Sequence, residues 1–268
     1  IYGTYRNLPS EINKLDRLIK TFELSKKELS EIINEIKPDV VINCIALGNL
    51  DDCEINKENC KSLNFDIVKN LVDILKNLNI KLVHFSSNAI YDGKNAPYDE
   101  NSKADPVNNY GMTKLQADSL IQNNLNNYLL LRPITMIGYK EEFQRENPAS
   151  FIIKKILKNQ TIKLVNDDFV NFLYLDDLVH LLSILLQKKI NGVFNISGDE
   201  TLNRYQLGLK ILKKIDSNVK IEECSLKDFN PKAKRAFNTT FNNNKIKNLI
   251  NFNFTSIDTA LDSIIKKT

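Results

Sequence analysis

A tyrosine and a lysine stand four residues apart in the segment Tyr110-Gly-Met-Thr-Lys114. On a helix, two residues at this spacing share one face. An ammonium group beside a phenol favours the phenolate, so we expect Lys114 to lower the pKa of Tyr110 from about 10 toward neutrality. Such a tyrosine can pass a proton to or from a carbonyl or alcohol oxygen. The same spacing is also frequent on solvated helix faces without chemistry, so its meaning depends on the elements around it.

A hydroxyl that could hold the same oxygen stands upstream, in Phe85-Ser-Ser-Asn88. The apolar run over 80–85 predicts a buried strand, and Ser87 follows its carboxyl end. Ser87 and Tyr110 would therefore meet if the helix that carries Tyr110 packs beside this strand.

The elements that must position these groups follow the alternating order of a doubly wound parallel sheet. Strands are predicted at 1–5, 40–46, 80–85 and 128–131, and helices at 26–36, 60–78 and 110–122. The run at 40–46 is so continuously apolar that we expect both faces of this strand to be covered. In such sheets ligands bind at the carboxyl ends of the strands. Asn43, Ser87 and Pro133 all stand at or near such ends.

The second half of the chain is less regular. Helices are predicted at 149–159, 175–187, 203–215 and 256–266, and strands at 161–165, 192–197 and 219–223. Asp176 and Asp177 stand where the second of these helices begins, so capping and a favourable interaction with the helix dipole explain them better than a metal site.

The amino-acid composition excludes several classes of function. The chain has 268 residues, of which 42% are hydrophobic and 26% charged, so it can bury a large core. The net charge of +4 is spread without a dense basic block, which argues against nucleic acid as a partner, and no apolar run is long enough for a membrane span. Four cysteines without a C-x-x-C pair and only two histidines predict neither a metal site nor a disulfide framework, as in a reducing cytoplasm. Cys44 is expected in the core.

With these motifs the chain resembles the extended short-chain dehydrogenase/reductases, and among them the dTDP-4-dehydrorhamnose reductases and related sugar-nucleotide reductases. The resemblance covers nearly the whole chain. Its motifs are Pro38-Asp-Val-Val-Ile-Asn-Cys-Ile-Ala46, Phe85-Ser-Ser-Asn-Ala-Ile-Tyr-Asp-Gly93, Pro97-Tyr98-x-Glu100, Pro106-x-x-x-Tyr110-Gly-x-x-Lys114, Leu131-Arg132-Pro133 and Gly192-Val-Phe-Asn-Ile-Ser-Gly198.

The resemblance implies an α/β fold with a Rossmann-type doubly wound parallel sheet and a smaller C-terminal α/β substrate lobe. The dinucleotide-binding domain would span 1–145, and the substrate lobe 146–268, with some segments returning to the main domain. The implied reaction is hydride transfer from NADPH to a keto group of a nucleotide-linked sugar. Ser87 would hydrogen-bond the carbonyl, Tyr110 would protonate the alkoxide, and Lys114 would hold the nicotinamide ribose.

The cofactor implied is NADP, with NAD as the alternative. Arg6, at the end of the second strand of the family pattern, would pair with an adenosine 2′-phosphate, whereas an acidic residue there would favour NAD. Glu23 aligns with an acidic residue near the adenine. The other implied cofactor contacts are Asn43, Cys44, Ala46, Ser86, Tyr110, Lys114 and Pro133.

For the substrate, the resemblance implies a contact from Asn88, where family members often carry Asp. Arg235 lies in the basic loop Lys232-Ala-Lys-Arg235 and would meet a nucleotide diphosphate, although a solvated loop explains it equally well. We expect Asn147, Pro148 and Phe151 to line the same cleft. Nucleotide sugars are the expected ligands, and a homodimer the expected assembly.

The chain departs from the family's sequence pattern in two places. After Ala46 the chain has Leu47-Gly-Asn-Leu50 in place of the family's tyrosine-threonine segment, which leaves the sugar open. The G-x-x-G-x-x-G loop that holds the cofactor pyrophosphate is absent, and the chain begins within what resembles the second strand. We therefore expect an N-terminal truncation that removes the first strand and the glycine-rich loop.

Two other functions stay open. An epimerase would keep the same residues and recycle bound NAD, whereas Asn88-Ala89 lacks the acidic pair typical of dehydratases. A reductase-like chain can also act as a non-catalytic regulatory subunit, as that of methionine adenosyltransferase does.

Overall fold

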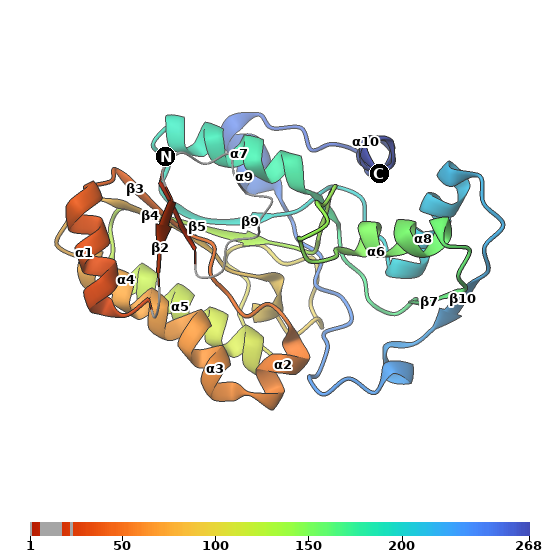
Figure 1. Ribbon diagram of the computed structural model, residues 1–268, viewed down its shortest axis with the longest axis horizontal. Helices are drawn as coiled ribbons and strands as arrows, with labels where there is room; N and C mark the ends of the chain where they lie inside the picture. Colours follow the sequence, from red (N-terminus) through yellow and green to blue (C-terminus); the bar gives the residue numbers. More distant parts are fainter. Residues whose placement is uncertain (1, 6–17, 22–23) are drawn as a thin grey trace.

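A four-stranded parallel sheet forms the centre of the molecule. The computed structural model describes residues 2–5, 18–21 and 24–268. The sheet has the order β3 (Val40–Asn43), β4 (Lys81–Phe85), β5 (Tyr128–Pro133) and β9 (Gly192–Ile196) (Figure 1). All three strand pairs are parallel, and each crossover passes through at least one helix. The predicted α/β doubly wound class is confirmed.

Helices cover both faces of this sheet. Figure 1 shows α1 (Lys26–Ile36), α4 (Ile67–Leu75) and α5 (Asn109–Asn124) below it, and α7 (Leu175–Gln187) and α9 (Asn244–Ile250) above it. Alternate residues of one strand enter different cores, as a pleated strand requires. Leu82 and Leu130 join the core of the lower helices, whereas Val83, Leu129 and Leu131 join the larger core shared with α7. None of the described helices is long and apolar enough to cross a membrane.

The strand β3 differs from the prediction. Val40 and Val41 are only partly buried, and Ile42 is 46% exposed. The cause is its place at the edge of the four-stranded sheet, where β4 is its sole strand partner within the described residues. The strands β1 (Gly3–Tyr5) and β2 (Leu18–Lys20) form a separate parallel pair. Cys44, expected in the core, is exposed just beyond β3.

The predicted helix over 60–78 is divided. The helix α3 (Lys57–Lys61) passes into a π-helical segment, Ser62–Asp66, and then into α4. Within the π-helical segment, the Asn64 side chain accepts a hydrogen bond from the Leu47 amide at 2.7 Å and donates one to the Leu47 carbonyl at 3.2 Å. The short helix α2 (Leu50–Ile55), capped by Asn49, was not predicted. The wider π turn thus fixes the loop that follows β3.

The smaller lobe lies at the right of Figure 1 and contains α6 (Pro148–Leu157), α8 (Arg204–Ile215) and α10 (Ile257–Lys267). Two short parallel pairs support it: β7 (Ile162–Val165) with β10 (Ile221–Cys224), and β6 (Met136–Ile137) with β8 (Leu173–Tyr174). The pair β6–β8 and the helix α9 were not predicted, because each is too short to show a period.

Some helices begin at a residue whose side chain caps the first turn. The Ser25 and Ser256 side chains accept the amides of Glu28 and Thr259 and so cap α1 and α10. The predicted capping by the acidic pair of α7 is wrong in detail, since Tyr174 stands at the cap position without a side-chain bond. Asp177 instead accepts two hydrogen bonds from Thr255, at 2.8 and 2.7 Å, and so ties α7 to the chain before α10.

The start of α5 depends on a glycine. A Cβ atom at Gly111 would lie 2.0 Å from the carbonyl oxygen of Ala89. We therefore expect Gly111→Ala to push α5 from the turn after β4 and to lower the free energy of unfolding by about 1–3 kcal/mol, despite the better helix propensity of alanine. Urea denaturation followed by circular dichroism measures the change. Gly48→Ala is the control, because its Cβ would meet only an Arg145 nitrogen at 3.4 Å. Equal stabilities of the two variants would contradict this packing.

Candidate active site

Ser87 and Tyr110 both lie at the carboxyl end of the sheet. Ser87 follows β4, where its hydroxyl accepts the Ala89 amide at 3.1 Å and contacts the Asn88 side-chain oxygen at 3.3 Å. Tyr110 is the second residue of α5, whose cap residue Asn108 accepts the Gly111 amide at 2.8 Å. The Ser87 hydroxyl lowers the pKa of the Tyr110 phenol, so the two groups lie close to each other. A carbonyl oxygen at this point could contact both hydroxyl groups.

The prediction that Lys114 lowers the pKa of Tyr110 is wrong. Burial is the largest influence and raises the pKa of the phenol. The Ser87 hydrogen bond and the charge of Arg145 act in the opposite direction, and Lys114 is not among the causes. At neutral pH the Tyr110 phenol is therefore protonated, which suits a group that donates a proton.

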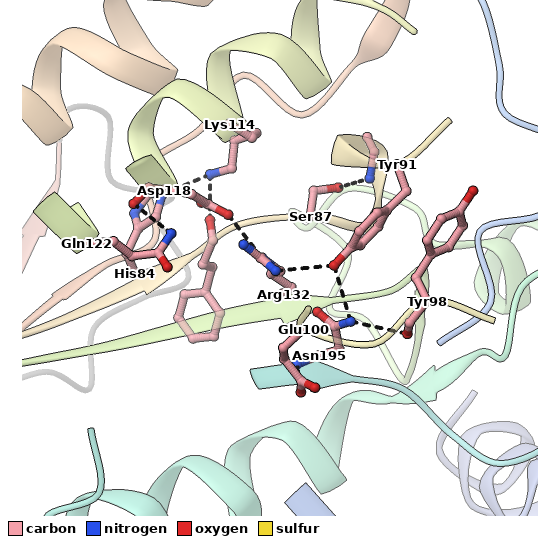
Figure 2. A network of polar contacts seen from close by, with 12 residues as sticks. His84, Ser87, Tyr91, Tyr98, Glu100, Lys114, Asp118, Gln122, Arg132 and Asn195 are labelled. Carbon is pink, nitrogen blue, oxygen red and sulfur yellow. Dashed lines mark hydrogen bonds and ion pairs between the residues drawn. The ribbon is translucent and has the colours of Figure 1, made fainter. Parts of the chain in front are cut away.

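Lys114 points into the protein. Its side chain is buried, and Nζ donates a hydrogen bond to the Phe85 carbonyl oxygen and lies 3.3 Å from His84 Nε2 (Figure 2). Burial lowers the pKa of Lys114 to about 8, and the charges of Asp118 and Cys60 oppose that shift. The lysine thus links α5 to β4.

A second buried contact links α5 to β5. Arg132 Nε lies 3.1 Å from the Asp118 carboxylate, and both side chains are almost fully buried (Figure 2). Burial raises the pKa of Asp118, while the Arg132 charge lowers it. Arg132 also donates to the Tyr91 hydroxyl at 3.2 Å, which in turn donates to the Asp99 carbonyl. The pair therefore positions the helix and the segment after Ser87 together.

The predicted cofactor residues near the sheet gather at one edge. Asn43, Ser86 and Pro133 are buried at the ends of β3, β4 and β5, while Cys44 and Ala46 are exposed beyond β3. The Ser86 hydroxyl is buried, and it lowers the pKa of the neighbouring Asp118 carboxyl. Arg6 and Glu23 lie outside the described residues. These residues fit the nicotinamide end of a dinucleotide, but the sequence contains no glycine-rich loop for the pyrophosphate.

The loop 230–240 brings the predicted substrate residues to the same place. Asn88 donates to the Thr239 hydroxyl at 2.6 Å, and the Asn108 side chain donates to the Lys234 carbonyl at 2.9 Å. Arg235 pairs with Asp51 of α2 at 2.9 Å. The other terminal nitrogen of Arg235, Nη1, is buried without a partner among the described residues, so this cation retains donor capacity.

Arg204, at the start of α8, is a second cation at this end, and it is ion-paired with Asp168. Burial and the charge of Arg235 both lower the pKa of Arg204. The two guanidinium groups are therefore close enough to repel each other electrostatically. The sequence pattern did not single out Arg204, His84 or Asp118. Only the position of Asp118, four residues after Lys114 on the same helix, could have indicated a role.

The residues expected to line the cleft from α6 have local contacts. Asn147 caps α6 by accepting the Ser150 amide at 3.1 Å, and its amide nitrogen donates to the Gly138 carbonyl at 2.8 Å. Pro148 is the first residue of the helix, and Phe151 is 37% exposed. A contact of these residues with substrate stays a prediction.

Comparisons with known proteins agree with this geometry. The model of the family described as RmlD substrate binding domain matches residues 19–268. The chain is 25% identical over 190 residues to the methionine adenosyltransferase 2 subunit beta of Xenopus tropicalis, covering 69% of this chain and 57% of the relative. It is 24% identical over 176 residues to dTDP-4-dehydrorhamnose reductase of Salmonella typhimurium, covering 63% of this chain and 58% of the relative. The chain thus spans less than two thirds of the length of these relatives.

A solved structure shares the fold. The dTDP-4-dehydrorhamnose reductase of Bacillus anthracis, solved in complex with NADP, superposes with a TM-score of 0.86 at 20% identity. The match covers 96% of this chain and 93% of the other. The arrangement of strands and helices described above is therefore that of a known fold.

The buried Lys114 predicts a specific dependence of stability on pH. Its pKa is lowered from 10.5 to about 8 on folding, so between these values the unfolded chain binds more protons and stability rises with pH. In Lys114→Met this contribution is absent. From pH 8 to pH 10 we expect the wild type to gain about 2 kcal/mol relative to Lys114→Met, as measured by urea denaturation at each pH. A constant difference between the two proteins would contradict the lowered pKa.

Proposed function

Because this chain belongs to the RmlD substrate binding domain family, we propose that it is an NADP-dependent oxidoreductase that reduces a keto group on a nucleotide-linked sugar. The observation that carries the proposal is the meeting of Ser87 with a protonated Tyr110 at the carboxyl end of the parallel sheet. In doubly wound folds this is the edge where ligands bind. The cytoplasm is the proposed compartment, and a homodimer stays a prediction.

The proposed division of labour follows the geometry. Bound NADPH supplies the hydride. The Ser87 hydroxyl donates a hydrogen bond to the substrate carbonyl oxygen, and the Tyr110 phenol gives that oxygen its proton as negative charge develops there. Lys114 fixes α5 on β4 through its bond to the Phe85 carbonyl and so keeps Tyr110 beside Ser87. The raised pKa of Tyr110 keeps the phenol protonated, as reduction requires.

The proposed ligand sites divide between the two parts of the chain. We place the nicotinamide end of the cofactor at the strand ends, near Asn43, Ser86 and Pro133, within a dinucleotide-binding part at 1–145. The substrate lobe at 146–268 contributes the loop 230–240, whose return to α2 and α5 supports a site between the parts. Arg235, with a donor still free, is proposed for the nucleotide diphosphate.

A regulatory subunit is the second candidate, and the identity with methionine adenosyltransferase 2 subunit beta favours it. The retained Ser87, Tyr110 and Lys114 favour catalysis. Purification of the protein from its own cells separates the two. A stable complex with a second enzyme, together with no consumption of NADPH on any sugar nucleotide, would support the regulatory role.

Tyr110→Phe tests the proton donor. Loss of the phenol hydroxyl leaves the fold intact but removes the proton, so we expect kcat for NADPH oxidation with a dTDP-4-keto sugar to fall by about 10²- to 10⁴-fold. Absorbance of NADPH under saturating substrate measures the rate. Tyr128→Phe, at the start of β5, is the matched control and should retain full activity. An unchanged rate in Tyr110→Phe would remove Tyr110 from the mechanism.

Arg235→Gln tests the substrate contact. A hydrogen bond to a charged group contributes about 1.5–3 kcal/mol, so KM for the sugar nucleotide should rise roughly 10- to 100-fold with little change in kcat. Lys232→Gln makes the same change of charge on an exposed side chain of the same loop and should leave KM unchanged. A KM for Arg235→Gln as low as that of Lys232→Gln would show that Arg235 does not contact the substrate.

A further inference from the structure

A chain of hydrogen bonds runs from Lys114 through His84 to the end of β3. Lys114 Nζ lies 3.3 Å from His84 Nε2, and His84 Nδ1 lies 3.2 Å from the side-chain nitrogen of Asn43. All three side chains are buried. Figure 2 shows the Lys114 amine directed toward His84. His84 has no role in the proposed reaction, and Asn43 lies at the proposed nicotinamide site.

At the Asn43 end of this series of hydrogen bonds, the donor and the acceptor can be identified. Its side-chain oxygen accepts the Ile45 amide at 3.1 Å, so its NH₂ group must face His84. An amide NH₂ group can only donate, and therefore His84 Nδ1 accepts. Burial and the charge of Lys114 hold the pKa of His84 well below its usual value, so the ring is neutral. A neutral ring whose Nδ1 accepts carries its proton on Nε2.

That proton faces Lys114. An ammonium group has three donors and no acceptor, so a charged Lys114 and a protonated Nε2 would present two donors to each other across 3.3 Å. A neutral amine has a lone pair and can accept from Nε2 while it donates to the Phe85 carbonyl. The arrangement of Asn43, His84 and Lys114 is thus satisfied when Lys114 is uncharged.

We propose that His84 is a positioning residue that couples the charge of Lys114 to the orientation of the Asn43 amide. When Lys114 becomes charged, His84 passes its Nε2 proton to the amine and takes one proton from solvent on Nδ1. The Asn43 amide then turns so that its oxygen accepts from Nδ1, and the Ile45 amide loses its partner. One proton enters the protein in total, and the imidazole ring stays neutral.

Other charged groups around Lys114 influence the pH at which it becomes charged, but they do not link it to Asn43. Asp118 on α5 and Cys60 from α3 favour the charged lysine, and Arg132 opposes Asp118 from β5. Tyr110 lies one turn before Lys114 on the same helix. Among these groups none has a hydrogen bond to Asn43 in the described structure. The link from Lys114 to the end of β3 therefore passes through His84.

Nuclear magnetic resonance of the free protein tests the coupling. The chain has only two histidines, so the ring nitrogen signals of His84 are assigned by comparison with His180→Gln. Above a midpoint of about pH 8 we expect the Nε2–H form of His84, and below it the Nδ1–H form. The backbone amide signal of Ile45 should shift with the same midpoint.

His84→Phe retains a ring but has no nitrogen to transmit the change. The Ile45 amide should then no longer shift near that midpoint, whereas in the control His180→Gln it should shift as in wild type. An Nδ1–H form of His84 at alkaline pH, or an Ile45 signal in wild type that is independent of pH, would overturn the coupling. Both measurements on the wild type are made without turnover. Their result is therefore independent of whether the protein reduces a sugar nucleotide.

Discussion

The docking of α5 on the sheet by polar contacts is the constraint on which the site depends. Helices usually pack on a sheet through an apolar face, but α5 buries Lys114 and Asp118 there. Lys114 is bonded to β4, and Asp118 is paired with Arg132 of β5. A buried charge without a partner is costly, so these bonds admit few other placements of the helix. Tyr110 and Ser87 consequently meet because the helix can rest on the two strands in only a narrow range of positions.

Hydrogen bonds also connect two loops that are far apart in sequence to α5. Asn64, in the π-helical segment, bonds the backbone of Leu47 and also lies 3.4 Å from the Thr113 hydroxyl of α5. On the other side, Asp51 accepts both the Ala233 amide and the Arg235 side chain, each at 2.9 Å. The loop after β3 and the loop 230–240 are thus fixed to the helix that carries Tyr110. Both loops beside the proposed site are therefore tied to α5.

Most of the fold could be predicted from the sequence, and part of the site could not. Apolar periods identified β4, β5, β9 and the long helices, because each depends on its own residues. The exposure of Ile42 and the short pair β6–β8 depend on neighbours remote in sequence, which a local pattern does not contain. The strand before Ser87 and the helix that carries Tyr110 were predicted from the sequence. The direction of the Tyr110 pKa was not, because it depends on burial and on where Lys114 points.

The exposed edge of β3 has a consequence for how the protein behaves in concentrated solution. A strand edge without a partner offers a row of amide and carbonyl groups to any other extended chain, and Ile42 adds an apolar contact. The small net charge of +4 gives little electrostatic repulsion between molecules. Within the described residues, no proline or bulge blocks this edge at Val40–Asn43. In the described part of the chain, the edge of β3 thus has the features that favour pairing with another extended chain, and we expect self-association to increase with protein concentration.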